Sequence, residues 1–153
     1  MSKKERAVAV QSAGVRSPVA LAKLTELSRQ VLAAQRVARA MISITLVTER
    51  TMSRLNREHL GHRGATDVIT FKLGSDADAF ILADIYLCPA VARAQAREHR
   101  VGVREEIARL VIHGTLHACG WEHPIDAQRT TSPMWRRQEQ LLKRFWTSAI
   151  STS

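Results

Sequence analysis

Residues Val101 to Cys119 form the longest stretch of the chain that is rich in apolar residues and compatible with a helix. Glu105 and Glu106 fall in its first turn, where acidic side chains complement the helix dipole. Gly120, directly after it, is a natural residue to end a helix. A helix with so much apolar surface is stable only when it is covered, so we expect it to be central and largely buried.

The rest of the chain alternates between strand and helix patterns. Alternating or β-branched runs predict strands over residues 7–11, 41–48, 66–71 and 80–88, the first of them an edge strand. Apolar residues at helical spacing predict further helices over residues 17–40, 49–60, 89–99 and 127–145. Ser17 and Pro18 are the expected N-cap and first residue of the first of these helices. At 153 residues, the whole chain (1–153) is the size of one domain.

Hydropathy and cysteine usage indicate the cellular compartment in which the protein is expected. No apolar run approaches the length that spans a bilayer, and the start of the chain, MSKKERAVAVQ, has no hydrophobic signal region. Cys88 and Cys119 are far apart and give no sign of a disulfide framework. These features argue against secretion and membrane insertion and favour the reducing cytoplasm.

The charge is strongly positive and uneven. Its net value of +9 favours polyanionic partners. Residues 1–64 hold twelve basic and four acidic residues, whereas residues 65–153 hold eleven and ten. The basic excess therefore belongs to the first half of the chain, where a solubilising surface and a nucleic-acid contact are equally consistent with it.

Three histidines cluster around the end of the central helix. His113 and His117 are four residues apart, so a helix presents both imidazoles on one face. A left-handed turn at Gly120 would bring His123 back to the same ion. Three nitrogen ligands with an open fourth position are typical of a catalytic zinc site. Cys119, two residues beyond His117, points to another face and is a poor extra ligand.

This histidine spacing also occurs in metzincin proteases, with one difference. Those enzymes have a glutamate after the first histidine, which acts as general base. Here that residue is Gly114, which has no side chain to accept a proton. The sequence therefore disfavours peptide hydrolysis by that mechanism, and Met134 is better explained as a core residue than as part of a Met-turn.

The assembled motifs resemble the YbeY family of bacterial endoribonucleases and rRNA maturation factors. The metal motif is similar to the family signature, and it reads His113-Gly-x-Leu-His117-x-x-Gly120-Trp-Glu-His123. Two further blocks resemble conserved family segments, namely Leu55-Asn56 followed by residues 66–71, and Ala83-Asp84-Ile85. Order and spacing hold from about residue 41 to residue 123, whereas the N-terminal third and the tail match only in general character.

The resemblance implies an α+β fold, with a small mixed sheet of about four strands flanked by about five helices and a metal site in a cleft at the end of the central helix. It implies one zinc ion per chain on the three histidines, although three imidazoles also suit other divalent transition metals. Its implied function is single-strand-specific RNA cleavage in 16S rRNA 3′-end maturation and ribosome quality control. Implied partners are the ribosome, a ribosomal protein and a GTPase.

The sequence also suggests catalytic and RNA-binding residues around the metal. Asp84 is the expected group beside the metal water, and Arg50, Arg54, Arg57 and Arg63 are the expected RNA-binding residues. Many relatives have a functionally important arginine where this chain has Leu60, and we expect Arg63 or Arg57 to replace it. The family's glycine before the acidic strand residue is Ala83 here. Proton removal could fall to Asp84, Glu122 or the substrate phosphate, and the sequence does not choose among them.

Two rival functions remain at this point. The chain could be a non-catalytic ribosome-assembly module whose metal only fixes the fold, or a metal-dependent hydrolase of another substrate. Metal content, thermal stability and RNA cleavage separate these readings.

Overall fold

The structure, a computed structural model, describes residues 4–74, 79–123 and 130–146. Its elements, in chain order, are β1 (Glu5–Ser12), α1 (Leu21–Ala34), β2 (Arg39–Leu46), α2 (Glu49–Leu60), β3 (Val68–Lys72), β4 (Ile81–Leu87), α3 (Pro89–His99), α4 (Val103–Ala118), α5 (Pro133–Leu141) and a π-helical turn, η3 (Leu142–Trp146). This composition confirms the expected α+β fold. None of the described helices combines the length and apolarity needed to cross a membrane.

The four strands form one mixed sheet in the order β1-β2-β4-β3. β1, β2 and β4 run parallel, and β3 pairs antiparallel with β4. The expected edge position of the first strand is confirmed. β3 is the other edge, and its side chains alternate between the two faces of the sheet. This edge strand becomes important because it forms one wall of the site described below.

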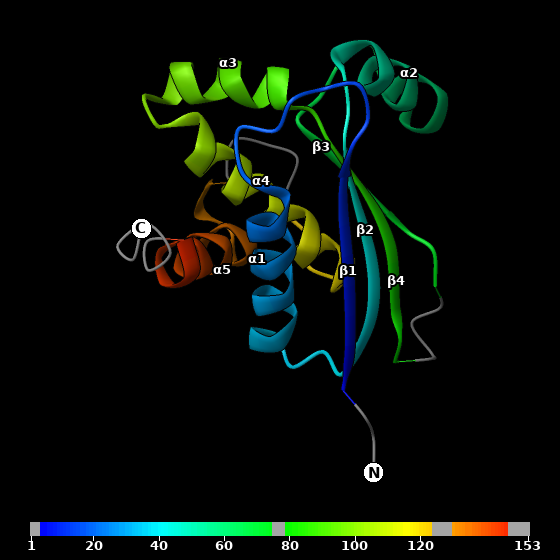
Figure 1. The fold of residues 1–153 in the computed structure, drawn as a ribbon, viewed down its shortest axis with the longest axis vertical. Helices are drawn as coiled ribbons and strands as arrows, with labels where there is room; N and C mark the ends of the chain where they lie inside the picture. The colour runs from blue at the N-terminus through cyan, green and yellow to red at the C-terminus, as the bar shows by residue number, and fades with distance from the viewer. Residues whose placement is uncertain (1–3, 75–78, 124–129, 147–153) are drawn as a thin grey trace.

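The main core lies between the sheet and the helices on one of its faces, where α1, α4 and α5 gather to the left of the sheet in Figure 1. Leu24 and Val31 of α1, Ile42 and Ile85 of the sheet, and Ile112 of α4 are all at most 1% exposed. Burial of such side chains stabilises the fold by about 1.5–3 kcal/mol each. As expected, α4 is central and buried along most of its length.

A smaller apolar cluster holds α2 at one end of the sheet (Figure 1). Met52 of α2 packs there with Val47, Ile69 and Cys88, and all four are buried. Thr48 caps α2, since its Oγ1 accepts a hydrogen bond from the Thr51 N–H at 3.1 Å. This packing places the C-terminal end of α2 beside β3.

Two predicted helix boundaries are wrong. Ser17 is not the N-cap of α1, because its hydroxyl accepts from the Val19 N–H within a local turn and the helix begins only after Ala20. The helix was expected to continue to about residue 40, but it ends at Ala34. Arg36 adopts a left-handed φ of 59°, which a right-handed helix cannot continue through.

The last helix begins later than the sequence predicts. Its expected start near residue 127 lies outside the described residues, and α5 starts at Pro133. Ser132 is the N-cap, and its hydroxyl accepts from the Trp135 N–H at 3.1 Å. Serine followed by proline is a strong helix start, which explains why the boundary falls here.

Candidate metal centre

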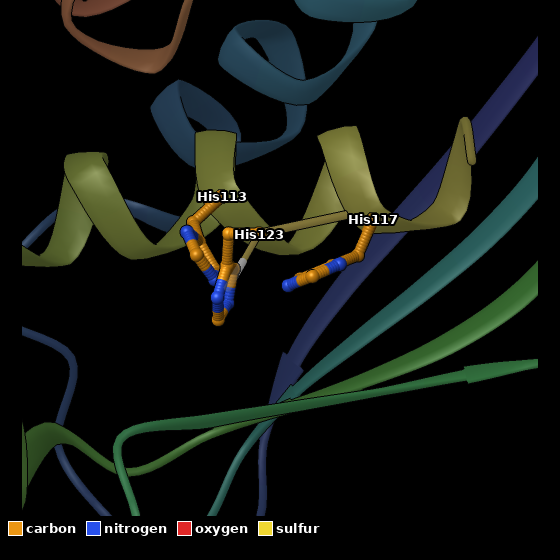
Figure 2. A group of neighbouring side chains, drawn as sticks. All are labelled: His113, His117 and His123. Carbon is orange, nitrogen blue, oxygen red and sulfur yellow. The ribbon is translucent and has the colours of Figure 1, made fainter. Parts of the chain in front are cut away.

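Two of the three histidines project from one face of α4. His113 and His117 are four residues apart, and their ring centroids lie 4.6 Å from each other. His113 is 6% exposed, while His117 is half-buried. Figure 2 shows both rings extending from the same side of the helix toward a common point. The helical spacing predicted from sequence therefore produces the predicted pair.

The third histidine returns through the turn that ends α4. Gly120 has a φ of 99°, a value that favours glycine, and its N–H donates to the His117 carbonyl at 2.9 Å. His123 then lies 5.1 Å from His113 and 4.9 Å from His117 between ring centroids (Figure 2). One ligand nitrogen from each ring lies within 4.8 Å of the others. The expected ligand cluster is thus assembled.

Hydrogen bonds select the nitrogen that each helix-borne ring offers. The Nδ1 of His117 lies 2.9 Å from the carbonyl oxygen of Trp121, which can only accept, so Nδ1 carries the proton. The Nδ1 of His113 lies 2.6 Å from Gln138 Oε1, while the amide nitrogen of Gln138 donates to Glu139. In both rings, therefore, Nε2 carries the lone pair that can bind a metal, which is the arrangement found at many metal-binding histidines.

This donor set fits a divalent transition metal. Three imidazole nitrogens suit zinc, nickel, copper or cobalt. Burial raises the pKa of the Cys119 thiol to about 11, despite an opposing effect of Lys72. A thiol must be deprotonated to bind a metal, so Cys119 stays a poor ligand at neutral pH. Among the described residues, the cluster consists of the three histidines alone.

Gly114 sets how closely α4 approaches the sheet. A Cβ at this position would lie 2.9 Å from Ile85 Cγ2 and 3.3 Å from Thr70 Oγ1. Thr70 also donates a hydrogen bond to the Gly114 carbonyl at 3.3 Å. The missing side chain thus has a packing role in addition to excluding the protease glutamate, which would not fit here.

The histidines line a pocket of about 350 Å³ whose opposite wall is β3 and the loop before it. Val68, Thr70 and Lys72 alternate toward this pocket, because every second residue of a strand shares a face. Asp67 and Glu122 also line it. The pocket therefore combines two carboxylates and one ammonium group with the three imidazoles.

Asp84 does not line this pocket. It alternates along β4 with Ala83 and Ile85, which are buried on the face that α4 covers. Its cross-strand neighbours are Ser43 and Phe71, so it lies on the opposite face of the sheet. This placement does not support the expected role of Asp84 beside the metal water.

The expected RNA-binding arginines lie outside the pocket. Arg50, Arg54 and Arg57 are exposed on one face of α2, and Arg63 is exposed in the following loop. Leu60 does line the pocket, so the position that holds an arginine in many relatives carries no charge at the site here. Arg63 is not among the lining residues, and the structure does not bring it to the place of that arginine.

Asp67 and Lys72 are site residues that sequence reasoning missed. Both belong to, or directly border, the strand predicted over residues 66–71. The signal for Lys72 was the alternation of that strand, which places it on the same face as Thr70 and Val68, whereas Asp67 precedes β3 and alternation does not place it on that face. What the sequence did not show was that this face turns toward the histidines.

Comparisons with known proteins agree with this arrangement. Residues 10–146 match the sequence model of the family described as endoribonuclease YbeY. A protein named endoribonuclease YbeY from Frankia alni is 35% identical over 144 residues, covering 86% of this chain and 77% of that protein. One of the same name from Acidothermus cellulolyticus is also 35% identical and covers 78% and 80% of the two chains.

A solved structure gives the same result for the fold. The solution structure of a Thermotoga maritima protein superposes with a TM-score of 0.64 and 26% sequence identity, covering 95% of this chain and 93% of that one. The family match spans β2, β3, β4, α4 and the complete histidine motif. The chain therefore belongs to the YbeY endoribonuclease family.

Proposed function

We propose that this chain is a zinc-dependent endoribonuclease that cuts single-stranded RNA during 16S rRNA 3′-end maturation and ribosome quality control. The observation that carries the proposal is the set of three converging imidazoles, two of them held with Nε2 available for a metal. Family membership supports RNA as the substrate, since the relatives are named endoribonucleases. The rRNA substrate would place the activity in the cytoplasm, with the ribosome, a ribosomal protein and a GTPase as partners.

A divalent metal on these histidines supplies two effects, a lower pKa for an adjacent water and compensation of negative charge on phosphate. The chain's own residues do the rest. Asp67 Oδ1 accepts from the Val68 N–H at 2.8 Å, which fixes the orientation of this pocket-lining carboxylate. We assign Asp67 the task of accepting the proton of the attacking water, with Glu122 on the same pocket as the alternative.

Lys72 is the cation we assign to the scissile phosphate. It lines the pocket on the wall opposite His117, whereas the position of the family arginine is the apolar Leu60. An ammonium group stabilises the charge that develops on the phosphoryl oxygens in the transition state. The exposed arginines of α2, together with Arg63, then hold the flanking RNA backbone, and this contact weakens with salt through counterion release.

The test compares two histidine variants. His117→Ala removes a ligand, whereas His62→Ala changes an exposed histidine that does not line the pocket. Bound metal, thermal unfolding and cleavage of a fluorescent single-stranded RNA are measured for both, with and without chelator. We expect His117→Ala and the chelator to abolish cleavage, and His62→Ala to behave like wild type.

Three other outcomes would redirect the proposal. Loss of the fold on metal removal, with no cleavage by the metal-replete protein, would favour the assembly-module function. Metal-dependent hydrolysis of another ester without RNA cleavage would favour a different substrate. Unchanged cleavage by metal-free His117→Ala would indicate a contaminating nuclease and refute the mechanism.

A further inference from the structure

A second cavity, of about 420 Å³, lies directly behind His113. Its walls come from three helices, with Gln95 and His99 of α3, Arg109 and Leu110 of α4, and Trp135 of α5. The volume is within the range of about 300–1,000 Å³ that is usual for small-molecule sites. This cavity is separate from the site expected from sequence.

The cavity adjoins the metal pocket. Asp67 and His113 line both spaces, so these two residues lie at the boundary between the metal pocket and the cavity. His113 is held at this junction by Gln138, which also lines the cavity. A ligand that spans both must therefore place one part at the metal and another against α3 and α5.

The charges on the cavity wall argue against an anion there. Arg109 is already paired with two carboxylates, because its guanidinium donates to Glu106 Oε1 at 2.9 Å and to both carboxylate oxygens of Glu139 at 2.9 and 3.0 Å. Burial acts to lower the pKa of Arg109, but these carboxylates outweigh burial and raise it. Glu106, only 3% exposed, and Asp67 place two carboxylates on the cavity wall.

The remaining wall suits a flat, partly apolar group. Leu110 and Val101 are aliphatic, and the half-buried indole of Trp135 offers an aromatic surface. Aromatic side chains stack on nucleobases in many proteins that bind single strands. Carboxylates, in turn, accept hydrogen bonds from the exocyclic amino groups of bases.

We propose that this cavity binds the nucleobase next to the scissile phosphate, stacked on Trp135, and prefers a base with an exocyclic amino group. This inference rests on the proposed function. A base can enter only if it is unpaired and turned away from its neighbours. The cavity would thus give a structural reason for cutting single strands in preference to duplexes.

The first test measures binding without cleavage. Affinities of the metal-loaded protein for CMP, UMP and ribose 5-phosphate are compared by calorimetry. We expect CMP to bind about tenfold more tightly than ribose 5-phosphate, the range of one stacked base. CMP should also exceed UMP by about tenfold, because only cytosine donates from its exocyclic position to a carboxylate.

Variants of α5 then locate the base. Trp135→Ala should remove the advantage of CMP over ribose 5-phosphate, and Trp135→Phe should retain most of it. Gln140→Ala, an exposed position on the same helix, is the matched control and should bind like wild type. Thermal unfolding of each variant shows whether a loss of binding reflects a loss of fold.

The second test uses RNA with a single abasic position next to the cleaved bond. In wild type the missing base should slow cleavage about tenfold, whereas in Trp135→Ala it should have no further effect. Equal cleavage of intact and abasic RNA by wild type, while His117→Ala stays inactive, would overturn the base site and leave the proposed function standing.

The reverse result is also informative. CMP binding that depends on Trp135, in a protein that never cuts RNA, would support the base site and refute the proposed function. Equal binding of CMP and UMP would overturn the assigned preference for an amino group. Equal binding of CMP and ribose 5-phosphate would overturn the base site itself.

Discussion

Gly114→Ala tests how tightly α4 is packed against the sheet. The added Cβ would lie 2.9 Å from Ile85 Cγ2, 3.3 Å from Ile85 Cδ1 and 3.3 Å from Thr70 Oγ1. Ile85 is fully buried and cannot swing into solvent. Inserting a methyl group into such a site costs about 1–3 kcal/mol.

A second effect opposes this cost. Alanine is favoured over glycine within a helix by about 1 kcal/mol. The expected net effect is therefore a loss of about 1 kcal/mol in the free energy of unfolding, which lowers the Tm of a domain of this size by about 2–4 °C. Denaturant unfolding and calorimetry measure both quantities.

The substitution also separates metal binding from cleavage. All three ligands lie on α4 and the turn that follows it, so they move together when α4 shifts away from β3. Asp67 and Lys72 stay with the other wall of the pocket. We expect the metal affinity, measured by competition with a chelator, to change by less than about tenfold, while RNA cleavage falls by more.

Ile85→Ala provides the internal control. In that background the two contacts with Ile85 are gone, so Gly114→Ala should be neutral or stabilising, and the coupling between the two changes should be about 1–3 kcal/mol. If Gly114→Ala stabilises the otherwise unchanged protein, or if its effect is the same in both backgrounds, the packing argument is refuted.

Three further predictions concern the pocket and its surroundings. Gln138→Leu should weaken metal binding by about 10–100-fold, because His113 loses the acceptor that orients its ring, and Gln138→Glu should restore it; chelator competition measures this. Lys72→Met should reduce kcat for RNA cleavage without changing metal affinity, and adding Leu60→Arg should recover part of the lost kcat. If Leu60→Arg recovers no activity at any salt concentration, a phosphate contact at this pocket is contradicted. Alkylation of Cys119 by iodoacetamide should be slow at pH 8 and should accelerate as the pH rises toward about 11, because the raised pKa keeps the thiol protonated; fast labelling at pH 8, followed by mass spectrometry, would contradict this.

Sequence patterns predicted the local features of the fold well. The bounds of α2 and α3 agree with the predicted ranges, since Thr48 and Pro89 mark clear helix starts. The histidine cluster was equally predictable, because a four-residue helical spacing and one glycine turn bring its members together.

Features that depend on how helices and strands pack together were harder to predict from the sequence. Alternation indicates which residues of a strand share a face, but it does not indicate which face meets a helix when both faces carry apolar residues. In β3 and β4, Phe71 and Tyr86 are partly buried on the face away from α4. No sequence pattern therefore placed Asp84 on the face away from α4, and the packing of α4 against the sheet decides it. The cavity behind His113 needed three helices from separate parts of the chain.

The confinement of all three ligands to residues 113–123 has a thermodynamic consequence. Closing so short a loop costs little entropy, so an unfolded chain keeps part of its affinity for the metal. Metal binding stabilises a fold only to the extent that the folded state binds more tightly than the unfolded one. An ion held here ties α4 to its own turn and links no distant parts of the chain. We therefore expect the protein to keep its fold without the metal, a behaviour that suits a catalytic ion better than a structural one.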